Sequence, residues 1–169
     1  MLRPWIAGLA LTALCASAVH AASFDARRPA DVARALNAHG VSGRMTREDG
    51  ETLFAGTAGT ANFTVRFHDC NAAATRCSTL LFVAGEWPSH APVTADQMNQ
   101  WNNWAIYCPG FVDGDHLPQV WSFMAVSART QAADLMANMT LWKGCLTSFG
   151  KFVAGPKAYL DVLTGAAPG

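Results

Sequence analysis

Residues 62–84 read NFTVRFHDCNAAATRCSTLLFVA, and this stretch decides the fold class. In residues 62–69 apolar side chains alternate with polar ones, which is typical of a β-strand with one buried face. Residues 79–84 form a continuous apolar run, which predicts a more central strand. A short connection between Cys70 and Cys77 joins the two runs. The stretch therefore predicts two strands of a sheet, with a cysteine at each end of their connection.

Local signals predict further elements on both sides of this stretch. Upstream, apolar residues at helical spacing over residues 29–39, followed by a glycine, predict a short helix. Residues 41–54 then read as a strand, a tight turn and a second strand. Downstream, Thr94 and Gln97 match a capping box, which predicts the start of a second helix. We expect that helix to end at Pro109.

The C-terminal part predicts a β-hairpin and a long helix. Residues 113–115, Asp-Gly-Asp, separate two apolar runs and predict the hairpin turn. From about residue 130 to residue 153, large apolar residues recur at steps of three and four, which predicts one long amphipathic helix. These residues are Leu135, Met139, Trp142, Leu146, Phe149 and Val153. Residues 156–169 end in small residues and proline, so we expect a flexible tail there.

This order of elements indicates an α+β fold in a single domain over residues 22–155. The order is a helix, antiparallel strands, a second helix, a β-hairpin and a long C-terminal helix. The chain shows no internal repeat and no linker that would divide it into two domains. Half of its residues are hydrophobic and 14% are charged, a composition typical of a folded domain.

Residues 1–21 have the composition of a signal peptide. A positive residue, Arg3, precedes an apolar run, and the run ends in the small-x-small sequence Val19-His20-Ala21. We expect cleavage after Ala21 and export to the periplasm or the medium, with no membrane insertion of the mature chain. The formal net charge is zero and no Lys/Arg run occurs, which argues against nucleic acid as a partner.

Cleavage would remove Cys15 and leave four cysteines, and an even number in an exported chain favours disulfides. Three connectivities are possible. We favour Cys70–Cys77 because this pair flanks a short connection between two strands, and Cys108–Cys145 then follows by exclusion.

Three features of the chain resemble the YbjN family, a group of bacterial proteins described as sensory-transduction regulators. The first is the strand that ends in Cys70, with the short loop to Cys77 and the apolar strand after it. The second is the pair Trp101-Asn102 in the middle helix, and the third is Thr140-Leu141-Trp142 in the last helix. The likeness extends over about residues 30–153. It implies a fold like that of type III secretion chaperones and implies no reaction and no catalytic residue.

Two adjacent asparagines in the middle helix require an explanation, because asparagine is slightly unfavourable inside a helix. We predict that Asn102 hydrogen-bonds the neighbouring backbone and is structural, as in the family that the chain resembles. Asn103 is left open as a binding residue. Trp101 and Trp142 are expected to be structural residues of the core.

Few residues suggest chemistry. His68, Asp69 and His116 could serve a hydrolase if the fold gathered them around one pocket. Adjacent strand residues point to opposite faces, however, so a strand end that leads into a disulfide is the simpler interpretation of His68-Asp69-Cys70. The segment Asp113-Gly114-Asp115-His116 lacks the further ligands of a calcium loop and is better explained as a turn. We expect no metal site and no cofactor.

The function that we favour is therefore non-enzymatic binding of a polypeptide partner, or self-association, in an envelope, stress or regulatory role. Trp87, Trp104 and Trp121 are the candidate anchors, because tryptophan is enriched at binding hot spots. The hydrolase is one alternative. A purely structural envelope protein without a specific ligand is another.

Overall fold

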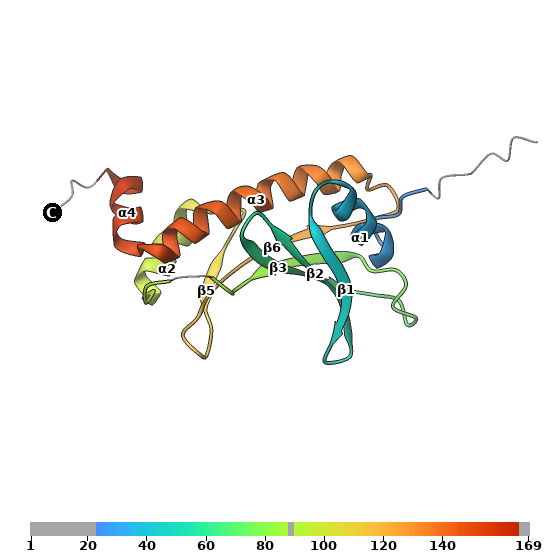
Figure 1. Cartoon of the computed structure of the whole chain (residues 1–169), viewed down its shortest axis with the longest axis horizontal. Coiled ribbons are helices and arrows are strands. Elements are labelled where there is room, and N and C mark those ends of the chain that lie inside the picture. The colour runs from blue at the N-terminus through green and yellow to red at the C-terminus, as the bar shows by residue number, and fades with distance from the viewer. Residues whose placement is uncertain (1–22, 88–89, 166–169) are drawn as a thin grey trace, which may run out of the picture.

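A computed structural model describes residues 23–87 and 90–165 of the chain (Figure 1). The predicted signal peptide lies outside the described residues. The elements follow the order α1 (Pro29–Ala38), β1 (Ser42–Glu48), β2 (Glu51–Ala58), β3 (Ala61–His68), β4 (Thr79–Ala84), α2 (Ala95–Trp104), β5 (Gly110–Val112), β6 (Pro118–Ala125), α3 (Ala132–Ala154) and α4 (Pro156–Thr164). The predicted α+β class is confirmed.

All the strands belong to one antiparallel sheet with the order β1-β2-β3-β4-β6-β5. The first four strands are neighbours in sequence and in space. The segment that contains α2 then carries the chain past the sheet, so that β6 pairs with β4 and the short β5 pairs with the start of β6. In this register Thr79 lies opposite Ala125, and Ala84 lies opposite Val120.

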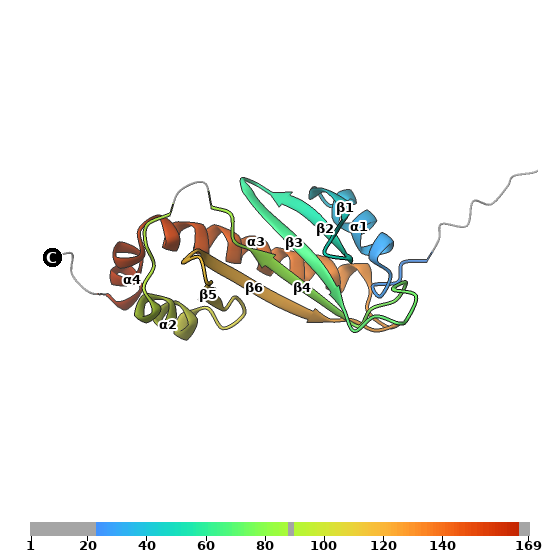
Figure 2. The same ribbon diagram turned by 90° about the horizontal axis from the view of Figure 1, so that it is seen from below.

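The long helix α3 lies along one face of the sheet (Figure 1). Figure 2 looks onto the face of the sheet that α3 does not cover. In this view from below, β3, β4 and β6 lie in front of α3. The core between α3 and the sheet is aromatic: the ring of Trp142 lies 6.1 Å from that of Phe63 and 5.8 Å from that of Phe82, between centroids. All three side chains are buried, as the alternation in β3 and the stripe in α3 predict.

A second aromatic cluster joins the three helices α2, α3 and α4. Trp101 of α2 stacks on Phe152 of α3 with 5.1 Å between ring centroids, and it also contacts Phe149. Tyr159 of α4 lies 5.9 Å from Trp101 and 6.0 Å from Phe152. The prediction that Trp101 and Trp142 are structural core residues thus agrees with their burial.

The prediction of a flexible tail from residue 156 is wrong for Pro156–Thr164, which form α4. Gly155 interrupts α3, and Pro156 can start a new helix because the first helical N–H needs no partner. Leu160 is buried and Tyr159 packs on the core, so a second apolar stripe holds this helix in place. Residues 166–169 lie outside the described part of the chain.

The end of α2 also differs from the prediction. Its start is confirmed, because Thr94 and Gln97 form the expected capping box. The helix ends at Trp104 and not at Pro109, because Ala105 leaves the helical conformation, and Cys108 lies in the following loop, where it forms a disulfide with Cys145 of α3. Trp104, at this end of α2, is 58% exposed.

Candidate functional site

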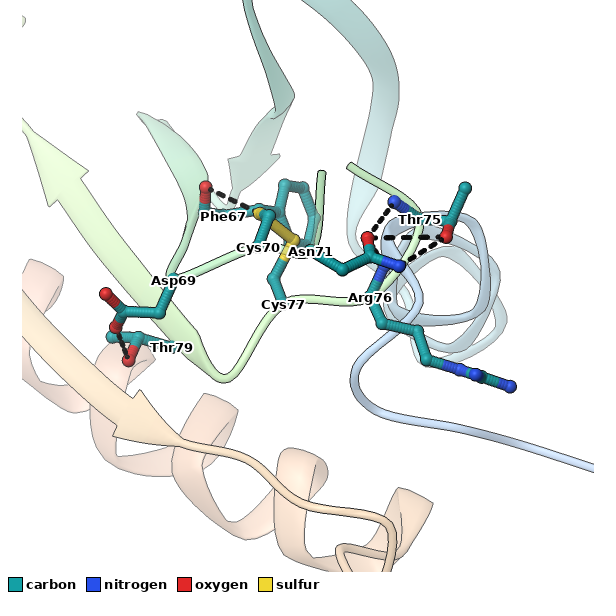
Figure 3. Close-up of a disulfide and its surroundings, with 8 residues drawn as sticks. All are labelled: Phe67, Asp69, Cys70, Asn71, Thr75, Arg76, Cys77 and Thr79. Atoms are coloured by element: carbon teal, nitrogen blue, oxygen red, sulfur yellow. Dashed lines mark hydrogen bonds between the residues drawn. A yellow bond between two sulfur atoms is a disulfide. The ribbon is translucent and has the colours of Figure 1, made fainter. Parts of the chain in front are cut away.

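The disulfides are those that the spacing favours, Cys70–Cys77 and Cys108–Cys145. Figure 3 shows the first of them beside a loop that is closed by its own hydrogen bonds. The side-chain oxygen of Asn71 accepts the backbone N–H groups of Thr75 and Arg76, at 2.9 and 3.1 Å. The Cys70–Cys77 disulfide links the chain after β3 to the chain before β4. This agrees with the interpretation of the two cysteines as a disulfide and not as a catalytic thiol.

The N-terminal segment is tied to the same loop. The backbone N–H of Cys77 donates to the carbonyl oxygen of Arg27 at 2.8 Å. Arg76 approaches the carboxylate of Asp25 to 3.7 Å. A side-chain hydrogen bond from Arg27 is the main cause that lowers the pKa of Asp25 from 3.8 to about 2. These contacts fix the corner of the molecule where β3 and β4 meet.

The three residues of the hydrolase hypothesis are not brought together. His68 lies opposite Thr79, which lies opposite Ala125 at the end of β6. His116 precedes Pro118 at the beginning of β6, roughly 20 Å away along a strand of this length. The carboxylate of Asp69 accepts the hydroxyl of Thr79 at 2.7 Å. The idea of a single pocket around His68, Asp69 and His116 is therefore wrong.

The turn between β5 and β6 is built around Asp113. Its carboxylate accepts the backbone N–H groups of Leu117 and Asp115 and the side-chain amide of Gln119. These bonds, the one from Leu117 first, lower the pKa of Asp113. The segment thus forms the predicted hairpin turn. Across the described residues, no group of three or more His, Cys, Asp or Glu side chains is placed to hold a metal ion.

Asn102 fastens the end of α2 to β5. Its side-chain amide donates to the carbonyl oxygen of Gly110 at 3.0 Å, and its oxygen accepts the N–H of Gly110 at 2.7 Å. A Cβ atom at position 110 would lie 2.6 Å from Sδ of Met98 and 3.1 Å from the backbone oxygen of Gln119, so a side chain there would require its neighbours to shift. Trp101 adds a bond from its indole N–H to the carbonyl oxygen of Cys108 at 2.9 Å. Asn102 hydrogen-bonds the backbone as predicted, whereas Asn103 is exposed.

We expect the variant N102A to lose about 1–3 kcal/mol of unfolding free energy, because it leaves the buried Gly110 backbone without its partners. The neighbouring variant N103A is the control and should change the unfolding free energy by less than about 0.5 kcal/mol. Urea denaturation of the two variants measures the difference. Equal effects would show that Asn102 is not the structural residue of the pair.

The tryptophans that were predicted as binding anchors differ in their positions. Trp87 is half-buried, its indole N–H donates to the carbonyl oxygen of Pro118 at 3.1 Å, and its ring packs on Phe149. These contacts make Trp87 a structural residue. Trp104 is exposed at the end of α2. Trp121 lies half-buried on β6 and stacks with Phe123, with 6.2 Å between ring centroids.

Trp121 and Phe123 belong to the face of the sheet that α3 does not cover, which we call the open face. The registers place Trp121 in one row with Val83 and Thr64, and Phe123 in the next row with Leu81 and Arg66. Alternate residues of the same strands, such as Val65 and Phe82, point into the core. Phe123 is 61% exposed, so the open face carries an aromatic pair at its β6 side.

The part of β6 that carries this pair is also a free edge of the sheet. β5 pairs with β6 from Pro118 to Val120, and Pro109 lies beside Trp121, whose N–H it accepts. Among the described residues no strand lies beside residues 121–125 on the side away from β4, and we call this segment the β6 edge (Figure 2). It contains Trp121, Ser122, Phe123, Met124 and Ala125 and no charged residue. Free edges without charges readily pair with another strand.

The backbone groups of the β6 edge can be assigned a direction. The N–H of Trp121 donates to the carbonyl oxygen of Pro109, away from β4, whereas the N–H of Val126 donates to Ser78 on the β4 side. Hydrogen-bonding direction alternates along an antiparallel strand, so the odd-numbered residues direct their backbone groups away from β4. Phe123 and Ala125 therefore present N–H and C=O groups at the free edge.

The other edge of the sheet is different. β1 carries Arg44, Arg47 and Glu48, and charges of this kind discourage strand pairing. A groove of about 890 Å³ lies between this side and β6 on the open face, with Arg66 held by Glu48 and Glu51 at 3.7 and 3.4 Å. The open face thus has two parts, the polar groove toward β1 and the aromatic β6 edge on the opposite side.

A second exposed apolar segment borders the β6 edge. In the loop between α2 and β5, Ile106 is 78% and Tyr107 is 76% exposed, next to Trp104. The disulfide at Cys108 and the bond from Trp121 to Pro109 hold this loop beside β6. Trp104 and Trp121 were predicted from the sequence as anchors, whereas Ile106, Tyr107 and Phe123 were not. The alternation along β6 could have indicated Phe123, but only the sheet order shows that its edge is free.

No family model matches the chain, and no curated protein matches it. None of the helices in residues 23–87 and 90–165 has both the length and the apolar character that crossing a bilayer requires.

Proposed function

We propose that this chain is an exported, non-enzymatic protein that binds an extended polypeptide by strand addition at the β6 edge. The observation that carries the proposal is the free, uncharged edge with its stacked aromatic pair, Trp121 and Phe123. An added strand would form backbone hydrogen bonds with the free N–H and C=O groups of Phe123 and Ala125. Strand addition gains affinity from such main-chain bonds and specificity from alternate side chains.

The aromatic pair supplies the apolar contact in this proposal. An added strand would cover Phe123, which is 61% exposed, and the open side of Trp121. Large aromatic side chains give much of the binding energy at interfaces. The exposed Trp104, Ile106 and Tyr107 of the neighbouring loop extend the same apolar surface beyond the edge. Asn103 lies beside this loop and is a peripheral contact at most.

Export to the periplasm or the medium is part of the proposal. The two cysteine pairs are placed as disulfides, which persist in oxidising compartments and are rare in the cytosol. The resemblance to the YbjN family, with its fold like that of type III secretion chaperones, supports a binding role by analogy. Function argued from fold is an association, so the β6 edge carries the proposal and the family does not.

Site-specific photo-crosslinking tests this function. We expect a photoreactive phenylalanine at position 123 to form adducts with a polypeptide in envelope extract. The matched control has the same group at Leu141, an equally exposed position on α3 with 59% exposure. The variant A125P in the position-123 background removes an edge N–H without disturbing the ladder to β4, because proline is tolerated at sheet edges.

The expected result is an adduct at position 123 that A125P reduces several-fold and that position 141 does not form. Adducts of equal yield at both positions, or adducts that A125P leaves unchanged, would contradict strand addition. A chain that forms no adduct at position 123 would be explained better as a structural envelope protein.

A further inference from the structure

We propose that Arg28 and Arg76 bind the phosphate group of a phosphomonoester at the corner of the molecule where β3 and β4 meet. The site uses no residue of the β6 edge and does not depend on the proposed strand addition. The chemistry that it recognises is the phosphate itself, which a soluble ester or a lipid headgroup can carry. Binding assays with both kinds of ester distinguish the two sources.

The arginines of this corner come from two segments, residues 23–39 and 70–77, which meet in the folded chain. The backbone N–H of Cys77 donates to the carbonyl oxygen of Arg27 at 2.8 Å and so joins them. The two segments contain four arginines, two aspartates and no lysine or glutamate. Since the whole chain has no net charge, the corner holds a local excess of positive charge.

Both aspartates of the corner already have partners. Asp25 accepts Nε–H and an Nη2–H of Arg27, both at 2.9 Å, and also accepts the backbone N–H of Arg27 at 3.1 Å. Asp31 is buried, accepts the backbone N–H of Asp25 at 3.0 Å and is paired with Arg34. Two of the four arginines are therefore left without a carboxylate of their own.

Arg28 and Arg76 are the two that remain. In each, the closest atom to Asp25 is Nε, which lies 3.8 and 3.7 Å from the same oxygen, Oδ2, farther than in a hydrogen bond. Their side chains are 49% and 51% exposed. Among the described residues their terminal amino groups donate no hydrogen bond. Because both guanidinium groups approach one oxygen atom, a single oxyanion can contact both of them.

Asp69 does not neutralise this pair of arginines, although it lies just before the second segment. Its carboxylate accepts the hydroxyl of Thr79 at 2.7 Å. Figure 3 shows the side chains of Asp69 and Arg76 extending away from each other. The exposed side of the arginine pair is therefore open to an anion from solution.

The charge of the pair favours a phosphomonoester over a carboxylate. A phosphomonoester carries about −1.5 to −2 charges at pH 7 and has three strong acceptor oxygens. It would balance two guanidinium groups, whereas a carboxylate brings a single negative charge. The planar guanidinium group also binds phosphate oxygens through two parallel N–H bonds. Two arginines that converge thus fit one phosphate group.

The start of α1 does not itself explain these arginines. Arg28 is the N-cap residue of α1 and directly follows Arg27. The helix dipole favours negative charge at this end, so two adjacent arginines here oppose it. Residues that break a local rule of this kind are expected at functional sites. A bound phosphate would bring negative charge to the same place and remove the conflict.

Titration calorimetry of the oxidised mature protein with inorganic phosphate at low ionic strength tests the site. We expect binding with a dissociation constant of about 1 mM or below. The variant R76Q should raise this constant by about 10-fold, and R28Q/R76Q by more, because each substitution removes charge-assisted hydrogen bonds. The matched control R44Q/R47Q removes two exposed arginines of β1 and should leave the constant unchanged. Circular dichroism checks that the variants are folded.

Vesicles distinguish a lipid headgroup from a soluble ester. Phosphatidic acid presents a phosphomonoester, whereas phosphatidylglycerol presents a diester with one charge. If the source is a lipid, the protein should co-sediment with phosphatidylcholine vesicles that contain phosphatidic acid, and R28Q/R76Q should lose this binding. Vesicles that contain enough phosphatidylglycerol for the same surface charge are the control. Binding of phosphate without binding of vesicles would identify a soluble ester.

The inference fails if neither inorganic phosphate nor phosphatidic acid vesicles bind. Binding that R28Q/R76Q leaves unchanged, or equal binding to the two charge-matched kinds of vesicle, would show a general attraction of anions and would overturn it too. These results do not affect the crosslinking at position 123, so strand addition stands or falls separately.

Discussion

The double variant C108S/C145S is expected to unfold with a free energy about 4 kcal/mol below that of the wild type. The Cys108–Cys145 bond closes a loop with a sequence separation of 37. A disulfide that closes a longer loop removes more conformational entropy from the unfolded chain and therefore stabilises the folded state more. The bond also holds the loop with Ile106 and Tyr107 against α3. We therefore expect this variant to weaken binding at the β6 edge too. Guanidinium denaturation gives the stability, and the yield of crosslinked adducts at position 123 gives the binding.

The matched comparison is C70S/C77S. This pair has a sequence separation of 7, so the same relation gives a loss of about 2.5 kcal/mol. We expect its loop to retain the hydrogen bonds that the side-chain oxygen of Asn71 accepts from Thr75 and Arg76. A larger loss from C70S/C77S than from C108S/C145S would contradict the argument from loop length.

The variant W142A should lose about 3–5 kcal/mol of unfolding free energy. The side chain is 1% exposed and fills the space between α3 and the rings of Phe63 and Phe82. Truncation would leave a cavity in the centre of the core, whose cost adds to the lost burial. Thermal and urea denaturation measure the effect.

Two control variants test whether lost core packing causes the destabilisation expected for W142A. W104A makes the same truncation at an exposed position, and we expect a change within about 0.5 kcal/mol. W142F keeps an aromatic ring and removes an indole N–H that has no acceptor among the described residues. Its cost should be about 1 kcal/mol, because a smaller ring leaves only a small void. A loss for W142A no larger than that for W104A would show that this core relaxes into the space.

Much of the fold could be predicted from local pattern. The alternation in residues 62–69 and the apolar run in 79–84 identified β3 and β4, because strand side chains alternate between two faces. The capping box at Thr94 identified the start of α2, because capping acts on groups within one turn. The disulfide pairing followed from a short connection and from exclusion. The helix α4 was missed, and a flexible tail was predicted from Pro156. This helix depends on contacts of Tyr159 and Leu160 with an aromatic cluster from distant segments of the chain.

The candidate site was predicted only in part. Trp121 was chosen for its residue type, and the more exposed Phe123 beside it was not. Trp87 was chosen by the same argument and is structural. Its indole N–H donates to the carbonyl oxygen of Pro118, and its ring packs on Phe149. Residue type alone does not distinguish a binding tryptophan from a packed one, since both bury a large ring.

The sequence by itself determined the strands, the helices α1 to α3 and their core faces, all of which depend on periodicity or on near neighbours in the chain. The Cys70–Cys77 pair followed from a short connection, and Cys108–Cys145 followed by exclusion. Only the tertiary structure decided which edge of the sheet is free. That edge exists because β6 pairs with β4 across the segment of α2, while β5 is too short to cover more than the start of β6. Strand order and strand length in a sheet are set by contacts between distant segments, and no local pattern in residues 62–84 contains them.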